Sequence, residues 1–135
     1  HMKPKISLLT LGVKNLDESF NFYRDTLNFP LHNYKPGDNN IMFKLDGTWL
    51  ALYSREKLAE DASIDPSSSG FAGFTFAHNL ASKSQVDDLI NDLREKGVRI
   101  VKEPQEVFWG GYSSYFADPD GYLWEVAHNP FTDLT

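Results

Sequence analysis

The sequence lacks several features that would point to particular classes of protein. It has no cysteine, which excludes disulfides, thiolate metal sites and a cysteine nucleophile together. It also lacks long hydrophobic runs, since its apolar stretches are only as long as a strand, and nothing like the apolar core of a signal peptide follows Lys5. We therefore expect a cytoplasmic protein without a transmembrane segment.

Positive charge is scarce, because 13 lysines and arginines stand against 19 aspartates and glutamates, for a formal net charge of −6. Binding to nucleic acid or to an anionic membrane would require a local basic patch. The sequence shows none, and even Arg55 stands close to Glu56, Glu60 and Asp61. We expect neither nucleic acid nor a membrane as a partner.

The first half of the chain follows a β-α-β-β-β pattern. An apolar, β-prone stretch over residues 6–13 precedes Asn15 and Glu18, which are spaced as a helix N-cap and its capping-box partner. Apolar residues then recur at helical spacing, at Leu16, Phe20, Tyr23 and Leu27. Three short strands are predicted after this helix, at about 31–34, 41–45 and 48–53.

The second half repeats the same pattern after a polar, turn-rich connection over residues 57–69. A strand is predicted over 71–77, and Ser82 with Gln85 forms a second capping box. A helical stripe follows and ends at Gly97, with apolar positions at Val86, Leu89, Ile90 and Leu93. Three more strands are predicted, at about 98–102, 111–117 and 122–127.

These patterns predict an α+β fold built of two tandem βαβββ modules. A β-α-β crossover in one sheet is right-handed and places the helix on one face, so each sheet keeps a free face. We expect two curved mixed sheets whose free faces enclose a cleft, where small molecules usually bind. Residues 1–135 are interpreted as a single domain, with module one at about 5–55, the linker at about 56–69 and module two at about 70–130.

Two motifs support a family resemblance. The repeated plan, "LDESFNFYRDTL" at 16–27 and "FADPDGYLWEV" at 116–126 together resemble the vicinal oxygen chelate superfamily. That group contains glyoxalase I, extradiol dioxygenases, fosfomycin resistance enzymes and bleomycin resistance proteins. The resemblance covers about 6–130 and implies a small-molecule ligand and a homodimer. It does not identify the reaction, because this one fold hosts many chemistries.

The resemblance also identifies positions that hold a metal in the metal-dependent members, and Glu125 matches the glutamate of the last strand. The other three positions are Leu8, Ala51 and Phe71, and none of these side chains can hold a metal. A one-residue slip in alignment places Leu9, Leu50, Leu52 or Gly70 there instead. Because catalytic sites for divalent metals need about three protein ligands, we predict no metal and no cofactor.

The corner at Asp118 predicts which residues accompany Glu125. With a three-residue turn over 119–121, Tyr115 lies opposite Glu125 and Ser113 lies opposite Ala127. Glu125 should then either accept a hydrogen bond from Tyr115 or take up a proton, because an unpaired carboxylate on an apolar wall is costly. The alternative is that Glu125 is a remnant of the fold, held by tyrosine or buried water.

The stretch "VFWGGYSSY" at 107–115 allows two interpretations. It is either a flexible aromatic flap at the cleft mouth or a glycine bulge with Trp109 packed in the core or at a dimer contact. By strand parity, the aromatic residues Phe71, Trp49 and Tyr53 share the cleft faces. The predicted ligand-binding residues are Glu125, Tyr115, Ser113, Trp109, Phe71, Trp49 and Tyr53.

Two functions remain open from the sequence. The first is a metal-free small-molecule binding protein of the glyoxalase/bleomycin-resistance type, whose aromatic cleft contains one carboxylate. The alternative is a glyoxalase-like lyase, isomerase or dioxygenase, which is either metal-dependent or uses Glu125 and Tyr115 as acid and base. A third possibility is a cleft filled by the protein's own side chains in a domain that serves only to pair with partners.

Overall fold

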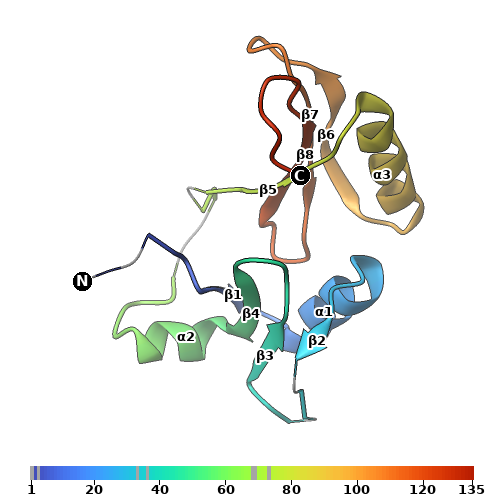
Figure 1. Ribbon diagram of the computed structural model, residues 1–135. Helices are drawn as coiled ribbons and strands as arrows, with labels where there is room; N and C mark the ends of the chain where they lie inside the picture. The colour runs from blue at the N-terminus through green and yellow to red at the C-terminus, as the bar shows by residue number, and fades with distance from the viewer. Residues whose placement is uncertain (1, 3, 33, 36, 68–69, 73) are drawn as a thin grey trace. The chain divides into compact units, whose positions relative to one another are not determined.

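The computed structural model describes residues 2, 4–32, 34–35, 37–67, 70–72 and 74–135. The chain divides into two compact units, His1–Ser68 and Ser69–Thr135, and each contains one four-stranded mixed sheet with helices (Figure 1). Both units contain the β-α-β-β-β order that the sequence predicts. The α+β fold class and the tandem modules are therefore confirmed. None of the described helices combines the length and apolar character needed to span a membrane.

The first unit has strand order β1-β4-β3-β2, with β1 parallel to β4 and the other pairs antiparallel. A parallel β1–β4 pair requires a crossover, and α1 begins it. The elements are β1 (Leu8–Val13), α1 (Leu16–Asn21), the π-helix η1 (Phe22–Thr26), β2 (Leu31–His32), β3 (Asn40–Phe43), β4 (Trp49–Ser54) and α2 (Arg55–Asp61).

Helix α1 begins as its sequence predicts, because Asn15 Oδ1 accepts a hydrogen bond from the Glu18 amide at 3.0 Å. The helix then widens into η1, where the Leu27 amide donates to the Phe22 carbonyl five residues earlier. Phe20 and Tyr23 of its inner stripe are buried, Tyr23 with no exposed surface, whereas Leu16 and Leu27 are half-buried. This stripe packs with the aliphatic and aromatic core of the sheet, which includes Ile41, Phe43, Leu50 and Leu52.

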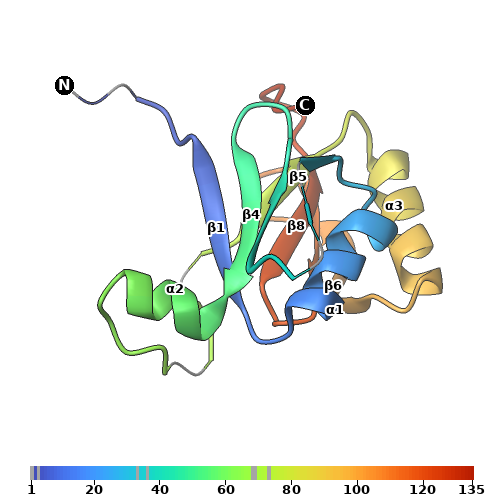
Figure 2. The ribbon, with the colours of Figure 1, turned by 90° about the horizontal axis from the view of Figure 1, so that it is seen from below.

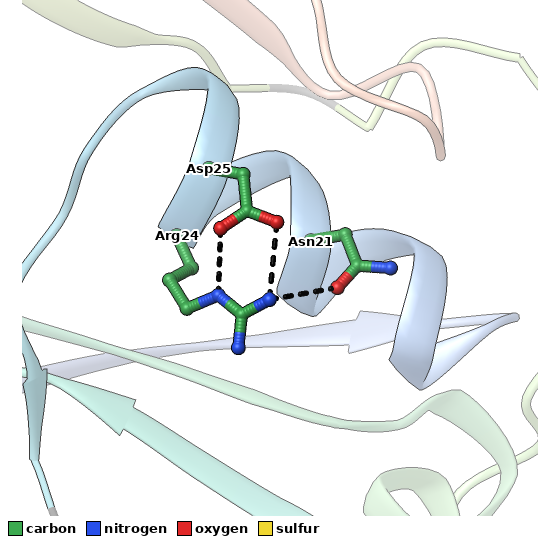
Figure 3. A network of polar contacts seen from close by, with 3 residues as sticks. All are labelled: Asn21, Arg24 and Asp25. Atoms are coloured by element: carbon green, nitrogen blue, oxygen red, sulfur yellow. Dashed lines mark hydrogen bonds and ion pairs between the residues drawn. The ribbon is translucent and has the colours of Figure 1, made fainter.

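The outer side of the same helical segment carries a small polar network (Figure 3). Arg24 Nε lies 2.7 Å from Asp25 Oδ1, and Arg24 Nη2 reaches Asp25 Oδ2 and Asn21 Oδ1 at 3.0 and 3.4 Å. The hydrogen bond from Arg24 holds the pKa of the Asp25 carboxyl below its ordinary value. Because both charged side chains are largely exposed, this pair contributes little to stability.

Helix α2 overlaps the start of the stretch that was predicted to be a turn-rich linker. Residues 55–61 are helical and directly follow β4, and Ala59 is their buried residue. The segment REKLAED is rich in strong helix formers, yet it has no apolar stripe for periodicity to reveal. Three predicted positions, Asn33 of the second strand and Ser68 and Ser69 of the linker, lie outside the described residues.

The second unit has strand order β5-β8-β7-β6, with β5 parallel to β8 and the other pairs antiparallel. Figure 2 shows α3 beside this sheet. The elements are β5 (Phe76–Asn79), α3 (Lys83–Glu95), β6 (Arg99–Glu106), β7 (Tyr112–Ala117) and β8 (Leu123–His128).

Both predicted ends of α3 are confirmed. The Gln85 amide donates to Ser82 Oγ at 3.2 Å, while Gln85 Oε1 accepts from the Ala81 amide at 2.9 Å. Gly97 ends the helix with φ +81°, and the Val98 amide donates to the Leu93 carbonyl. The stripe of Val86, Ile90 and Leu93 is buried.

The predicted strand over 71–77 is wrong in its start, because β5 spans only Phe76–Asn79. Phe76 pairs with Trp124, the second residue of β8. A parallel partner exists only where β8 has begun, so the described residues Phe71, Ala72 and Phe74 have no strand to pair with. Phe71 therefore precedes the sheet with 69% of its surface exposed, and Gly73 lies outside the described residues.

Candidate functional site

Glu125 lies on the face of the second sheet that points away from α3. Its neighbours Trp124 and Val126 are buried on the core side, and alternation along β8 directs Glu125 to the other face. The predicted register is confirmed, since Tyr115 pairs with Glu125 and Ser113 with Ala127. The sheet thus brings Ser113, Tyr115 and Glu125 together on one face.

The hydrogen-bond partner of Glu125 differs from one of the two expectations. Ser113 Oγ donates to Glu125 Oε2 at 2.6 Å, so among the described residues the donor is Ser113 rather than Tyr115. Ser113 is 3% exposed and Glu125 is half-buried. A serine hydroxyl on the diagonal position reaches the carboxylate, whereas the long tyrosine side chain directly opposite carries its hydroxyl past it. The short bond is charge-assisted.

Tyr115 lies beside this pair as a protonated phenol. Burial and the negative charge of Glu125, in that order, raise the pKa of Tyr115 above its ordinary value. The hydroxyl therefore keeps its proton at neutral pH and is available as a hydrogen-bond donor. This face of the second sheet combines one fixed acceptor, Glu125, with one retained donor, Tyr115.

The first sheet also has a face directed away from its core. Leu50 and Leu52 of β4 are buried, while Trp49 and Tyr53 alternate with them and are half-buried. This placement agrees with the parity from which these two residues were predicted. Trp49 and Tyr53 belong to the first unit, whereas Ser113, Tyr115 and Glu125 belong to the second.

His32 is a polar neighbour of Trp49 that the sequence analysis did not select. The two rings lie 4.8 Å apart at an interplanar angle of 58°. His32 pairs with Met42, and Met42 pairs with Ala51, so His32 occupies a row that crosses the sheet on this face. The β2–β3 register brings His32 to Trp49, and that register depends on pairing between strands rather than on the residues next to His32.

The remaining two predicted site residues lie outside the strands. Phe71 precedes β5, and Trp109 lies in the β6–β7 turn, which is closed by the Val107 amide donating to the Gly111 carbonyl at 3.0 Å. The Trp109 ring folds over Gly111, where a Cβ would lie 1.9 Å from its nearest ring atom. The turn therefore presents a half-exposed Trp109 and a fully exposed Phe108.

The side chains around Glu125 do not fit a divalent metal. Its ladder neighbours are Tyr115 and Ala77, and one carboxylate oxygen already accepts from Ser113. Within the described ranges, no group of three or more His, Asp or Glu side chains is placed to hold a metal ion. The positions that the resemblance identifies, Leu8, Ala51 and Phe71, have no ligating atom in their side chains.

The chain is similar to a known superfamily and to several known proteins. The Glyoxalase/Bleomycin resistance protein/Dioxygenase superfamily profile matches residues 5–126. Metallothiol transferase FosB of Shouchella clausii is 32% identical over 123 residues, covering 90% of this chain and 77% of that protein. The uncharacterized protein YraH of Bacillus subtilis is 30% identical over 124 residues, covering 90% of this chain and 96% of that protein. A glyoxalase-related enzyme from Fulvimarina pelagi superposes with a TM-score of 0.86 at 27% identity, covering 98% and 94% of the two chains.

Proposed function

This chain belongs to the Glyoxalase/Bleomycin resistance protein/Dioxygenase superfamily, and on that premise we propose that it is a metal-free small-molecule binding protein. Its ligand is aromatic or amphipathic and binds on the face of the second sheet that points away from α3. Glu125, Ser113 and Tyr115 supply its polar contacts. The other predicted site residues, Phe71, Trp109, Trp49 and Tyr53, are proposed as aromatic ligand contacts of the unit to which each belongs.

The observation that carries this proposal is the hydrogen bond from Ser113 to Glu125. It fixes one carboxylate oxygen and leaves Oε1 to accept a hydrogen bond from an amine, amide or hydroxyl group of the ligand. Tyr115 can donate to an acceptor on the same ligand. A few placed polar groups beside apolar and aromatic surface are typical of small-molecule sites.

A second function, catalysis, is favoured by the names of similar proteins. FosB of Shouchella clausii is named a metallothiol transferase, so this chain could be a related metal-dependent enzyme or a glyoxalase-like lyase, isomerase or dioxygenase. The missing ligating atoms at Leu8, Ala51 and Phe71 argue against the metal-dependent form. A metal-free form would use Glu125 as base and Tyr115 as acid.

A ligand screen on protein treated with a chelator tests the proposal. We expect aromatic compounds with an amine, amide or hydroxyl group to raise the melting temperature, because a ligand that binds only the folded state stabilises it. Glu125→Gln should weaken their binding about tenfold, as expected when a charged acceptor becomes neutral, whereas Glu95→Gln on the exposed side of α3 should not. Equal affinity in both variants would contradict the role of Glu125.

Turnover separates the two functions. Under the binding proposal, wild type releases each ligand unchanged. Product formation that is lost in Tyr115→Phe would instead support the metal-free enzyme.

We also propose that the protein forms a homodimer, which members of this superfamily often do. Light scattering on the purified chain tests this assembly, and a mass corresponding to a single chain at all concentrations would contradict it.

A further inference from the structure

The second unit contains a hollow that none of the predicted site residues lines. It has a volume of about 410 Å³, within the range of small-molecule sites, and it lies where β5 and β8 end. The chain after β8, drawn dark red in Figure 1, contributes most of its lining. Its lining residues are Asn79, Leu80, Ala81 and 128–135.

A hydrogen bond of His128 determines which of its ring nitrogens can accept a hydrogen bond from a ligand in this hollow. The Leu80 amide donates to the Ala127 carbonyl at 2.8 Å, and His128 Nδ1 lies 2.9 Å from the Leu80 carbonyl oxygen. A carbonyl can only accept, so Nδ1 carries a hydrogen. In the neutral ring, the other nitrogen, Nε2, is therefore an acceptor, and the bond at Nδ1 orients the half-buried ring.

Two polar side chains of the segment after β8 also accept hydrogen bonds from within that segment. Asn129 Oδ1 accepts from the Phe131 and Thr132 amides at 2.9 and 3.2 Å. Asp133 Oδ1 accepts from the Thr135 amide and hydroxyl, and these bonds lower the pKa of the Asp133 carboxyl. Asp133 is thus ionised at neutral pH, and its Oδ2 remains for a ligand.

Apolar side chains complete the lining, namely Leu80, Pro130, Phe131 and Leu134. Phe131 also contacts the β6–β7 turn, since a Cβ at Gly110 would lie 2.8 Å from the Phe131 ring. The hollow therefore combines an anionic oxygen and a neutral acceptor with an apolar, partly aromatic wall. An ammonium group can donate to both acceptors while an attached ring packs on the wall.

We propose that this hollow is a second binding site, distinct from the one at Glu125, and that it takes a small primary amine with an aromatic or alkyl group. Asp133 and His128 Nε2 accept hydrogen bonds from the ammonium group. Phe131 and Leu80 contact the apolar part of the ligand. Because Glu125 has no part in this site, the inference stands or falls separately from the proposed function.

Titration of ¹⁵N-labelled protein with 2-phenylethylamine tests the site, with 2-phenylethanol as the uncharged ligand of the same shape. We expect the amine to shift the amide signals of residues 79–81 and 128–135, and the alcohol to bind at least about tenfold more weakly, because it cannot make the charge-assisted bond. Shifts at other residues, equal binding of the two ligands, or no binding of the amine would overturn the proposal.

Two variants identify the groups responsible. Asp133→Asn should weaken amine binding about tenfold, because a charged acceptor is lost. His128→Gln should weaken it only about threefold, because one neutral acceptor is replaced by another at a different position. Asp88→Asn, which makes the same charge change on the exposed side of α3, should leave the affinity unchanged, as should Glu125→Gln. Wild-type affinity in Asp133→Asn, or an equal loss in Asp88→Asn, would show that no specific site is present.

Discussion

Ser113 Oγ lies 2.6 Å from Glu125 Oε2, although Ser113 stands two positions along the β7–β8 ladder from Tyr115, which faces Glu125 directly. The first prediction concerns this bond. A double-mutant cycle of Ser113→Ala and Glu125→Ala should give a coupling free energy of about 1.5 kcal/mol in urea unfolding, at the low end for bonds to charged groups because Glu125 is half-buried.

Ser114 provides the matched control for this cycle. Its hydroxyl is also buried but donates to the Val126 carbonyl at 2.8 Å. Ser114→Ala should destabilise the protein and yet show no coupling to Glu125→Ala. A coupling near zero for Ser113, or an equal coupling for Ser114, would mean that the serine does not hold the carboxylate.

The second prediction concerns the ionisation of two tyrosines. The pKa of Tyr115 is raised by burial and by Glu125, whereas the pKa of Tyr112 is raised first by its hydrogen bond to Asp87. Glu125→Gln should lower the pKa of Tyr115 only in part, because burial remains. Titration followed by ¹³C NMR of the tyrosine rings should show Tyr112 unchanged in that variant.

Asp87→Asn provides the reciprocal control and should lower the pKa of Tyr112 alone. A raised tyrosine pKa contributes stability that is fully present below the unfolded value of about 10 and is lost as pH rises through the folded value. The stability gained from Tyr115 should accordingly fall off only in alkali. A Tyr115 pKa that does not respond to Glu125→Gln would place the two groups too far apart to interact.

The third prediction concerns the β6–β7 turn. A Cβ added at Gly111 would overlap the outer ring atoms of Trp109, so Gly111→Ala should drive the indole into solvent. Because a half-exposed side chain can swing away, the stability cost should stay below about 1 kcal/mol. Tryptophan emission should shift to longer wavelength, and the shift should vanish when Trp109→Phe is added. An unshifted emission spectrum would contradict this placement of the ring.

The fourth prediction concerns the start of α3. Ser82→Ala removes the acceptor for the Gln85 amide and should lower the free energy of unfolding by about 1 kcal/mol. Ser82→Asp keeps an acceptor at the same position and should retain most of the stability. Equal losses in the two variants, measured by urea unfolding, would show that the cap is not what Ser82 contributes.

Local chemistry explains which parts of the structure could be predicted from the sequence. Asn15 and Ser82 could be predicted as caps because each accepts a hydrogen bond from an amide only three residues later. Such a bond needs no contact with a distant part of the chain. The β7–β8 register follows in the same way from the short turn after Asp118, whose Oδ1 accepts from the Tyr122 amide. These features fixed the face on which Glu125 lies.

Features that depend on distant partners could not be predicted. The start of β5 is set by where β8 begins, so a strand pattern at Phe71 was misleading. The contact of His32 with Trp49 depends on a register across two strands. The choice of Ser113 over Tyr115 as donor depends on side-chain reach. Helix α2, by contrast, could have been predicted from its high content of helix-forming residues.

Metal content tests the central claim most directly. Purified wild type and Glu125→Gln are incubated with zinc, nickel, cobalt, manganese and iron(II), dialysed, and analysed for bound metal. The proposal of a metal-free binding site predicts less than about 0.1 metal ion per chain in both proteins, because Glu125 has too few partner ligands. Near-stoichiometric metal in wild type and little in Glu125→Gln would contradict it.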